Sequence, residues 1–356
     1  MTTMGAEEEF LLVDPTEART VPLGRDVLRH ARRARIADSP SSVELHEELA
    51  SSQVEAVTGV CRSLDDLRAD LAAGRHLVAR AARAAGAMAV SSGTAALPGT
   101  GDRSLNDAER FAGIGRLYAK VATDYEVSGC HIHVGVPDPD TAVAVINHMR
   151  PWLPTLLALS ANSPFADGRD TGYASWRMMQ QAHFPGSGVP PRFTSAADYR
   201  RAVERLVECG VLVDASMSFW LVRPSPRFPT VELRAADAVP AVDDAVLLAA
   251  LTRGLVLTAL RELSAGREGP ELDEQVCAAA VWSAARYGLD GPAVDPRPGR
   301  SVPAADLARR LVELVSPALE ETGDLPAVRR LWARLLEGGT GSRRQRAAAR
   351  TAAAGP

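Results

Sequence analysis

Pairs of ionisable residues stand two positions apart in three segments that alternate between polar and apolar residues. These pairs are Glu7 and Glu9, His131 and His133, and Glu232 and Arg234. Side chains alternate between the two faces of a strand, so each pair is expected to project from one face. A fourth pair, Glu48 and Glu55, lies seven positions apart and would share one side of a helix.

Carboxylates that converge from several strands repel one another, and divalent cations relieve that repulsion. Several acids with one histidine suit Mg²⁺ or Mn²⁺ better than Zn²⁺, which prefers more histidine or cysteine. Two or more such ions, together with arginines, are what a nucleoside triphosphate requires. Each pair alone also fits an ordinary solvated strand or helix face, so it is their joint occurrence that indicates a metal site.

The composition excludes several classes of protein. The chain has 356 residues, of which 46% are hydrophobic and 24% charged, so it is neither disordered nor fibrous. Its net charge of −4 argues against binding to nucleic acid or anionic membranes, and no apolar run approaches the ~20 residues of a membrane span. Lys120 is the only lysine, which excludes a P-loop. The scattered cysteines predict free thiols in a reducing compartment, the cytoplasm.

The candidate residues must be positioned by strands that are interspersed with helices. Alternation predicts strands over 5–13, 87–90, 129–136, 216–222 and 230–235. Apolar spacing predicts helices over 54–85, 106–125, 138–161, 195–209, 242–263, 272–287, 304–319 and 326–336. This scattered order indicates an α+β protein rather than a doubly wound one.

Two further segments stand out by composition. Residues 162–193 are rich in Gly, Pro, Ser and Arg with little periodicity, and their aromatic and Met content argues against disorder. A long loop of this kind is usually functional. No linker or internal repeat divides the chain, so residues 1–337 are expected to form one domain. Residues 338–356 form a low-complexity Ala/Arg/Gly tail that is expected to be frayed or disordered.

The sequence resembles the glutamate–cysteine ligase type 2 family, the bacterial carboxylate–amine ligases of the glutamine synthetase-like superfamily. The motifs that carry the resemblance are GAEEEFLLVD at 5–14, SQVEAVTGVC at 52–61, CHIHVGV at 130–136, LSANSPF at 159–165, DGRDTGYASWR at 167–177, RPSPRF at 223–228 and TVELRAAD at 230–237. Each motif is weak to moderate alone, but they run in the family's order over nearly the whole chain before the tail. The resemblance implies a glutamine synthetase-type catalytic domain, in which a curved, mainly antiparallel sheet forms a funnel backed by helices.

The resemblance also implies roles for individual residues. The positions that match metal ligands are Glu7, Glu9, Glu48, Glu55, His131 and Glu232. Glu47 is an alternative to Glu48 as a metal ligand, because the spacing of these acidic positions varies by one residue across the superfamily. His133 would face the phosphates or the substrate, and Arg234 matches the arginine that steadies the transferring phosphoryl group. Candidate contacts for a substrate carboxylate or phosphate are Arg169, Arg177 and Arg223.

The implied reaction is ATP-dependent formation of an amide bond. A glutamate side-chain carboxylate attacks the γ-phosphate of ATP to give an acyl phosphate, and an amine, typically that of cysteine, displaces phosphate. The products are γ-glutamylcysteine, ADP and phosphate, and cysteine ligation is weak in some members of the family. Two or more Mg²⁺ or Mn²⁺ ions would neutralise the phosphates, and residues 162–193 would form the lid or wall that shields the acyl phosphate from water.

The expected partners are therefore small molecules, with neither nucleic acid nor membrane. A homo-oligomer is compatible with the resemblance, because members of the family are commonly oligomeric. Two alternatives remain open. One is a phosphagen-type kinase on a related scaffold, which would transfer phosphate to a guanidino or amine group. The other is a non-catalytic relative that binds ATP or another metabolite.

Overall fold

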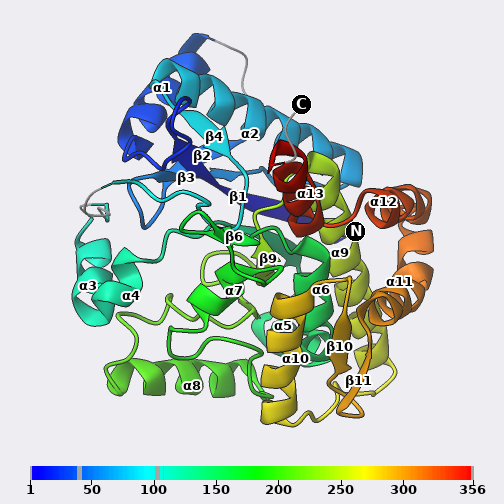
Figure 1. Ribbon diagram of the computed structural model, residues 1–356. Helices are drawn as coiled ribbons and strands as arrows, with labels where there is room; N and C mark the ends of the chain where they lie inside the picture. Colours follow the sequence, from blue (N-terminus) through cyan, green and yellow to red (C-terminus); the bar gives the residue numbers. More distant parts are fainter. Residues whose placement is uncertain (1, 38–41, 101–104, 107, 354–356) are drawn as a thin grey trace.

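One antiparallel sheet carries the paired ionisable residues. The computed structural model describes residues 2–37, 42–100, 105–106 and 108–353. Its seven-stranded sheet has the order β2–β3–β1–β5–β9–β8, with β4 paired to β1 (Figure 1). The strands are β1 (Met4–Val13), β2 (Glu44–Glu47), β3 (Gln53–Val57), β4 (Met88–Val90), β5 (Gly129–Gly135), β8 (Val222–Pro224) and β9 (Thr230–Asp237). All pairings are antiparallel, which confirms the predicted mainly antiparallel α+β sheet.

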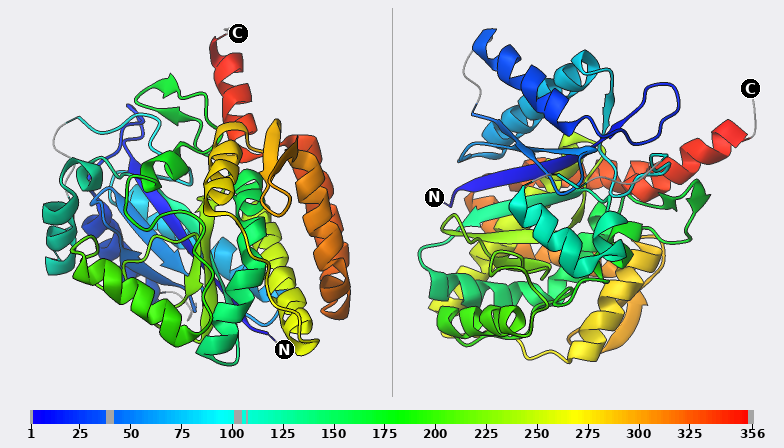
Figure 2. Two further views of the ribbon diagram at one scale, coloured as in Figure 1. Left: turned by 90° about the horizontal axis from the view of Figure 1, so that it is seen from below. Right: turned by 90° about the vertical axis from the view of Figure 1, so that its left-hand side faces the viewer.

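Helices back the sheet on the face opposite the candidate residues (Figures 1 and 2). Those that pack on this face are α1 (Gly24–Ala37), α2 (Leu64–Ala84), α5 (Pro139–Met149), α6 (Leu153–Ser160) and α9 (Val242–Ser264). Outside them lie α10 (Glu274–Tyr287), α11 (Ala304–Glu321) and α12 (Leu325–Gly338). The remaining helices are α3 (Glu109–Tyr118), α4 (Lys120–Thr123), α7 (Trp176–Gln181), α8 (Ala196–Glu208) and α13 (Gly341–Ala353).

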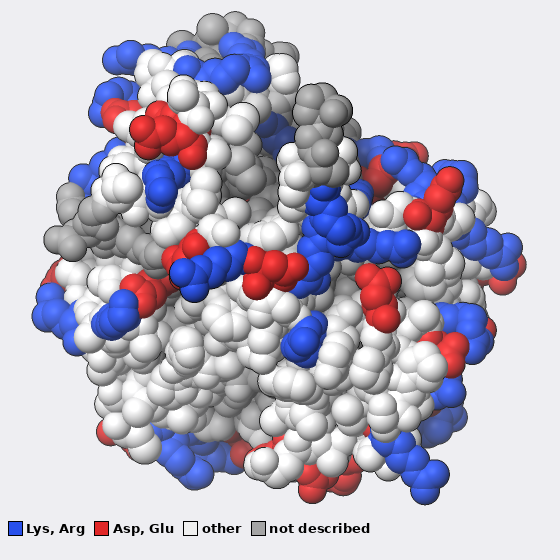
Figure 3. Space-filling model, in the orientation of Figure 1, with Lys and Arg blue, Asp and Glu red and all other residues white. Residues whose placement is uncertain are grey.

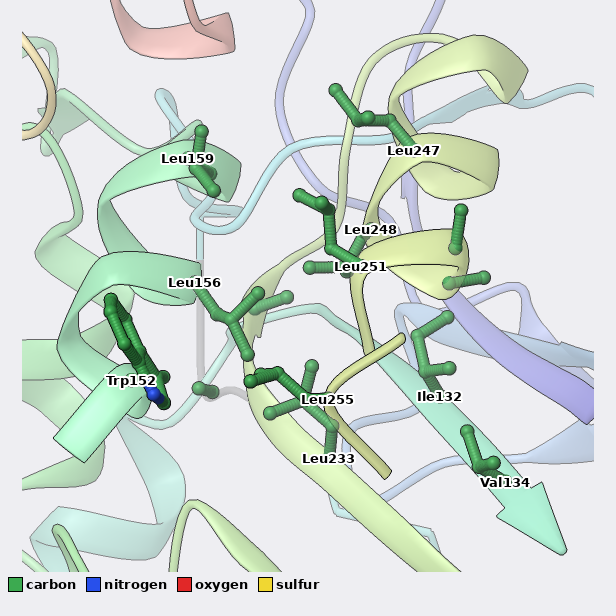
Figure 4. Close-up of a cluster of buried hydrophobic side chains, with 14 of the residues drawn as sticks. Ile132, Val134, Trp152, Leu156, Leu159, Leu233, Leu247, Leu248, Leu251 and Leu255 are labelled. Atoms are coloured by element: carbon green, nitrogen blue, oxygen red, sulfur yellow. The ribbon is translucent and has the colours of Figure 1, made fainter. Parts of the chain in front are cut away.

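The hydrophobic core fills the space between the sheet and these helices. Ile132 and Val134 of β5 and Leu233 of β9 are fully buried, and they point toward leucines of α6 and α9 (Figure 4). Because side chains alternate along a strand, this packing turns His131, His133 and the neighbouring acid of β9 to the other face. The hydrophobic core therefore fixes which face of the sheet carries the ionisable residues.

The predicted helix over 54–85 is wrong in its first part. Residues 53–57 are strand β3, paired with β1, and helix α2 begins only at Leu64, after the N-cap Ser63. The apolar residues of 54–57 fit either period, and pairing with β1 decides in favour of the strand. The predicted strand over 216–222 is also displaced, since β8 covers only Val222–Pro224.

Two segments that were expected to lack regular structure contain short elements. Residues 162–193 include the two-stranded sheet of β6 (Phe165–Ala166) and β7 (Arg169–Asp170), followed by α7. Within the tail that was expected to be frayed, residues 341–353 form α13, and its first residues, Gly341 and Ser342, are buried. The assignment of residues 1–337 to one domain stays a prediction.

The surface agrees with the small net charge. Basic and acidic side chains are interspersed on the face shown in Figure 3, and uncharged atoms cover a broad area below them. Among the described residues, no helix combines the length and the apolarity needed to cross a bilayer.

Candidate active site

A cavity of about 400 Å³ opens on the polar face of the sheet. This volume is in the range of small-molecule sites. Every site residue expected from the sequence lines it except Arg169; the lining members are Glu7, Glu9, Glu48, Glu55, His131, His133, Arg177, Arg223, Glu232 and Arg234. Arg169 is exposed on β7, outside this cavity. The structure therefore brings together residues from segments that are far apart in the sequence.

Strand register explains how the first acids meet the histidines. Glu7 of β1 lies opposite His131 of β5, and Glu9 lies opposite Glu55 of β3. His131 Nδ1 lies 3.2 Å from a carboxylate oxygen of Glu7, and its Nε2 lies 3.6 Å from one of Glu9. His133 Nε2 lies 3.2 Å from the other oxygen of Glu7.

Two groups of potential metal ligands share His131. One consists of Glu7, His131 and Glu232, and the other of Glu9, Glu55 and His131. Within each group, one ligand atom from each residue lies within 4.8 Å of the others. The imidazole Nε2 atoms of His131 and His133 are buried, and apart from these carboxylate contacts they have no hydrogen-bond partner among the described residues. A carboxylate-rich donor set with one histidine suits a hard divalent cation.

The charges around the acids differ across the cavity. Burial raises the pKa of Glu55 well above its usual value, and the negative charges of Glu48 and Glu7 add to that effect. Burial and the charge of Glu9 likewise raise the pKa of Glu48 to about 8. Ionising both carboxylates in this buried setting is unfavourable, and a hard divalent cation is the group that would stabilise them in the charged form, so the donor set fits Mg²⁺ or Mn²⁺.

Glu232 differs from Glu48 and Glu55, because two arginines bind its carboxylate and lower its pKa. Arg223 Nε donates to one carboxylate oxygen at 2.8 Å, and Arg234 Nη1 donates to the other. Burial acts to raise the pKa of Glu232, but the charges of Arg234 and Arg223 outweigh it and hold that pKa well below its usual value. Glu232 therefore stays ionised and fixes both guanidinium groups at the cavity wall.

The second acidic pair is assembled by a hairpin rather than by a helix. Glu55 lies on β3, and Glu48 follows β2 at the turn between these strands. The prediction that Glu48 and Glu55 share one side of a helix is wrong. Both residues nevertheless line the same cavity, because the β2–β3 hairpin brings them together. Of the two alternatives, Glu48 contributes to the charge around Glu55, whereas the Glu47 carboxylate lies 3.5 Å from Arg25 Nε.

The structure adds cavity residues that the sequence reasoning missed. Tyr125 lies between β5 and α4, and burial raises its pKa to about 12. Phe228 lies at the rim, 53% exposed, with its ring edge-on to His133 at a centroid distance of 6.0 Å. Neither residue stands in a spacing pattern, so only the RPSPRF motif could have drawn attention to Phe228.

Comparison with known proteins gives consistent matches over the whole chain. The model of glutamate–cysteine ligase family 2 matches residues 3–356. A protein from Saccharopolyspora erythraea that carries the name glutamate–cysteine ligase 2-2 is 58% identical over 354 residues, which are 99% of this chain and 89% of that protein. A Salinispora arenicola protein named glutamate–cysteine ligase 2 is 45% identical and covers 97% of this chain and 89% of its own length.

Solved structures share the fold at low sequence identity. Glutamate–cysteine ligase from Francisella tularensis, solved in complex with AMP, has a TM-score of 0.69 and 14% identity, covering 96% of this chain and 83% of that one. A bifunctional glutathione synthetase from Pasteurella multocida has a TM-score of 0.70 and 16% identity, covering 99% of this chain and 49% of that one. These likenesses agree with the glutamine synthetase-like ligase fold expected from the sequence.

Proposed function

This chain belongs to glutamate–cysteine ligase family 2, and we propose that its cavity is the active site of an ATP-dependent carboxylate–amine ligase. The observation that carries the proposal is the shared face of β3, β1, β5 and β9, where acids, histidines and arginines converge on one cavity. An acid would attack the γ-phosphate of ATP, releasing ADP and forming an acyl phosphate. An amine would then displace phosphate and leave an amide.

The acids and His131 would hold two or more Mg²⁺ or Mn²⁺ ions. One ion fits the group of Glu7, His131 and Glu232, and another fits Glu9 and Glu55, with Glu48 beside them, because a neutral imidazole binds a single ion. Such ions neutralise phosphate charge and align the reacting oxygens. Their presence would also remove the repulsion among the acids.

The arginines supply the positive charge that this nearly lysine-free chain needs. Arg234 would stabilise the charge that develops on the transferring phosphoryl group, and its bond to Glu232 holds it in place before the substrates arrive. Arg223 and Arg177 are candidates for phosphate or substrate carboxylate. His133, whose Nδ1 lies 2.9 Å from Thr230 Oγ1, would face the phosphates or the substrate.

The names of the relatives suggest glutamate as the acid and cysteine as the amine. We therefore propose γ-glutamylcysteine as a product, formed at a rate that depends on how well the cavity accepts cysteine. The four free cysteines agree with a reducing, cytoplasmic environment. The proposed partners are ATP, an amino acid or other carboxylate, and an amine. A homo-oligomer is the expected assembly, because members of the family are commonly oligomeric.

A phosphate-release assay with ATP, Mn²⁺ and a matrix of acids and amines tests this function. Release should require the metal, an acid and an amine together, and should fall to background in Glu9→Gln. If no pair stimulates release, the ligase proposal is wrong. Phosphorus NMR of the products separates the kinase alternative, because a kinase would give a phosphorylated amine or guanidino product without free phosphate.

A further inference from the structure

Asp237, at the end of β9, is a fully buried carboxylate outside the cavity lining. It accepts hydrogen bonds from the backbone N–H of Asn162 at 2.8 Å and from the hydroxyls of Ser163 and Ser175 at 2.7 Å each. Ser175 is also the N-cap of α7. Asp237 thus joins both ends of the 163–175 excursion to the central sheet.

The Asp237 carboxylate also lies next to the guanidinium of Arg177, a residue in the first turn of α7. The Arg177 backbone N–H donates to Ser163 Oγ at 3.1 Å, and its Nη1 lies 3.9 Å from Asp237. Its Nη2 donates to the carbonyl of Arg234 at 3.3 Å. Only 3% of Arg177 is exposed, and its Nε and Nη1 make no hydrogen bond to any described residue. The guanidinium is therefore held in place at the cavity wall with part of its hydrogen-bonding capacity unused.

Gly129 makes room for this guanidinium. A methyl group at Gly129 would lie 2.6 Å from Arg177 Nη2, which is closer than nonbonded atoms approach. The backbone N–H of Gly129 donates to Glu9 at 2.6 Å. Arg177 therefore lies directly beside the acidic group, where a small displacement would change its distance to a bound phosphate or carboxylate.

The C-terminal segment fixes the far end of the network. Gln345 Nε2 donates to Asn162 Oδ1 at 2.8 Å and to the Asn162 carbonyl at 3.0 Å, and the Ser342 N–H donates to the carbonyl of Ala161 at 2.9 Å. A methyl group at Gly341 would lie 2.1 Å from Asn162 Oδ1, so the backbone of α13 begins in direct contact with this side chain.

A second contact from α13 holds the loop that precedes Arg177. Arg346 makes a two-pronged ion pair with Asp170, at 2.8 and 2.7 Å, and donates to the carbonyl of Tyr173 at 2.8 Å. The last turns of α13 project away from the rest of the chain (Figure 2), and Arg350 is exposed. Only the first turns of the helix contact the network.

We propose that residues 340–346 act as a brace that positions Arg177 in the active site, through Asn162 and the positioning residue Asp237. The proposal rests on the proposed function in one respect, namely that Arg177 contacts an anionic substrate. Arginine gains binding energy when its guanidinium is already aligned, and a displacement of about 1 Å can cost about 100-fold in rate. A C-terminal segment rich in small and basic residues thereby contributes to a site that it does not line.

The test compares Gly341→Ala and Gln345→Ala with the matched control Arg350→Ala, in the full chain. Hydrogen–deuterium exchange of residues 162–177 needs no turnover, and it should become at least about 5-fold faster in the first two variants only. Their kcat/KM should fall at least about 10-fold, mainly through KM for the substrate that Arg177 contacts. Their melting temperatures should fall by no more than about 4 °C, because overpacking at Gly341 costs about 1–3 kcal/mol and the rest of the chain is unchanged.

A double-mutant cycle then asks whether the effect passes through Arg177. In an Arg177→Ala background, Gly341→Ala should change kcat/KM by less than about 2-fold, because the positioned group is already absent. Unchanged exchange at 162–177 would overturn the brace, whatever the activity. Faster exchange with unchanged KM and kcat, or an equal loss in both backgrounds, would overturn its role in positioning Arg177. If no acid–amine pair supports turnover, the ligase proposal fails by itself, and the exchange data still decide the brace.

Discussion

Glu8 and Glu9 are adjacent and point to opposite faces of β1. Glu8→Gln should therefore lower stability, whereas Glu9→Gln should lower turnover. Glu8 is 2% exposed on the helix-covered face, where Arg75 Nε donates to it at 3.0 Å and Arg75 Nη2 donates to its other oxygen. Glu9 faces the cavity beside Glu55 and Glu48. Charge supports the fold at the first position, whereas at the second it would hold a cation.

The cost of Glu8→Gln can be worked from its contacts. Breaking a buried ion pair costs about 3–5 kcal/mol, and Arg75 keeps bonds to the carbonyls of Val239 and Pro240, so about 3 kcal/mol is expected. With roughly 2.1 cal/mol/K of unfolding entropy per residue, this lowers the melting temperature of the 356-residue chain by about 4 °C. The turnover of the folded fraction should stay within about 2-fold of the unmodified chain.

Glu9→Gln should show the reverse pattern. The amide oxygen can still accept from the Gly129 N–H, and one repelling charge disappears, so the metal-free melting temperature should hold or rise. Turnover should fall at least about 100-fold, because a charge that grips the cation is gone. Thermal melts in EDTA and phosphate release with Mn²⁺ measure the two effects. If Glu9→Gln lost several degrees and kept its activity, the assignment of the two faces to stability and catalysis would be refuted.

Three further changes test other parts of the site. Glu232→Gln should cut turnover at least about 100-fold in the phosphate-release assay, since two arginines lose their shared carboxylate; near-normal turnover would contradict its role. Because the pKa of Glu48 is about 8 in the folded protein and 4.5 is its ordinary value, the folded state binds the extra proton between these values. Metal-free stability should therefore fall by up to about 1.4 kcal/mol per unit as pH rises from 4.5 to 8, and urea melts should show Mn²⁺ or Glu48→Gln reducing that slope. Gly129→Ala should displace Arg177 and raise KM, whereas an unchanged KM would argue against a substrate contact there.

Strand alternation was sufficient to predict most of the candidate site. In β1, β5 and β9 a hydrophobic face packs against helices, so two-residue spacing fixed the side on which Glu7, Glu9, His131, His133 and Glu232 lie. Alternation predicts the face of each residue because one face of each of these strands is buried, and this does not depend on the order of the strands in the sheet. The chemical types of these residues then indicated a divalent cation.

The parts that depend on tertiary contacts could not be predicted. Glu48 meets Glu55 through a hairpin between two short strands whose apolar residues also fit a helix. Gln345 belongs to a low-complexity Ala/Arg/Gly segment, and its docking depends on Asn162, far away in the sequence. Arg169, which was suggested by a motif position, lies exposed on β7 outside the cavity, so its contact with a substrate stays a prediction.

Crystals grown with Mn²⁺ and a non-hydrolysable ATP analogue would test the central claim most directly, through the anomalous signal of manganese. The account predicts peaks about 2.0–2.6 Å from ligand atoms of Glu7, His131 and Glu232, and of Glu9 and Glu55, each also touching a phosphate oxygen. Phosphates bound elsewhere, or a cavity whose carboxylates carry no cation in the presence of manganese and nucleotide, would contradict it.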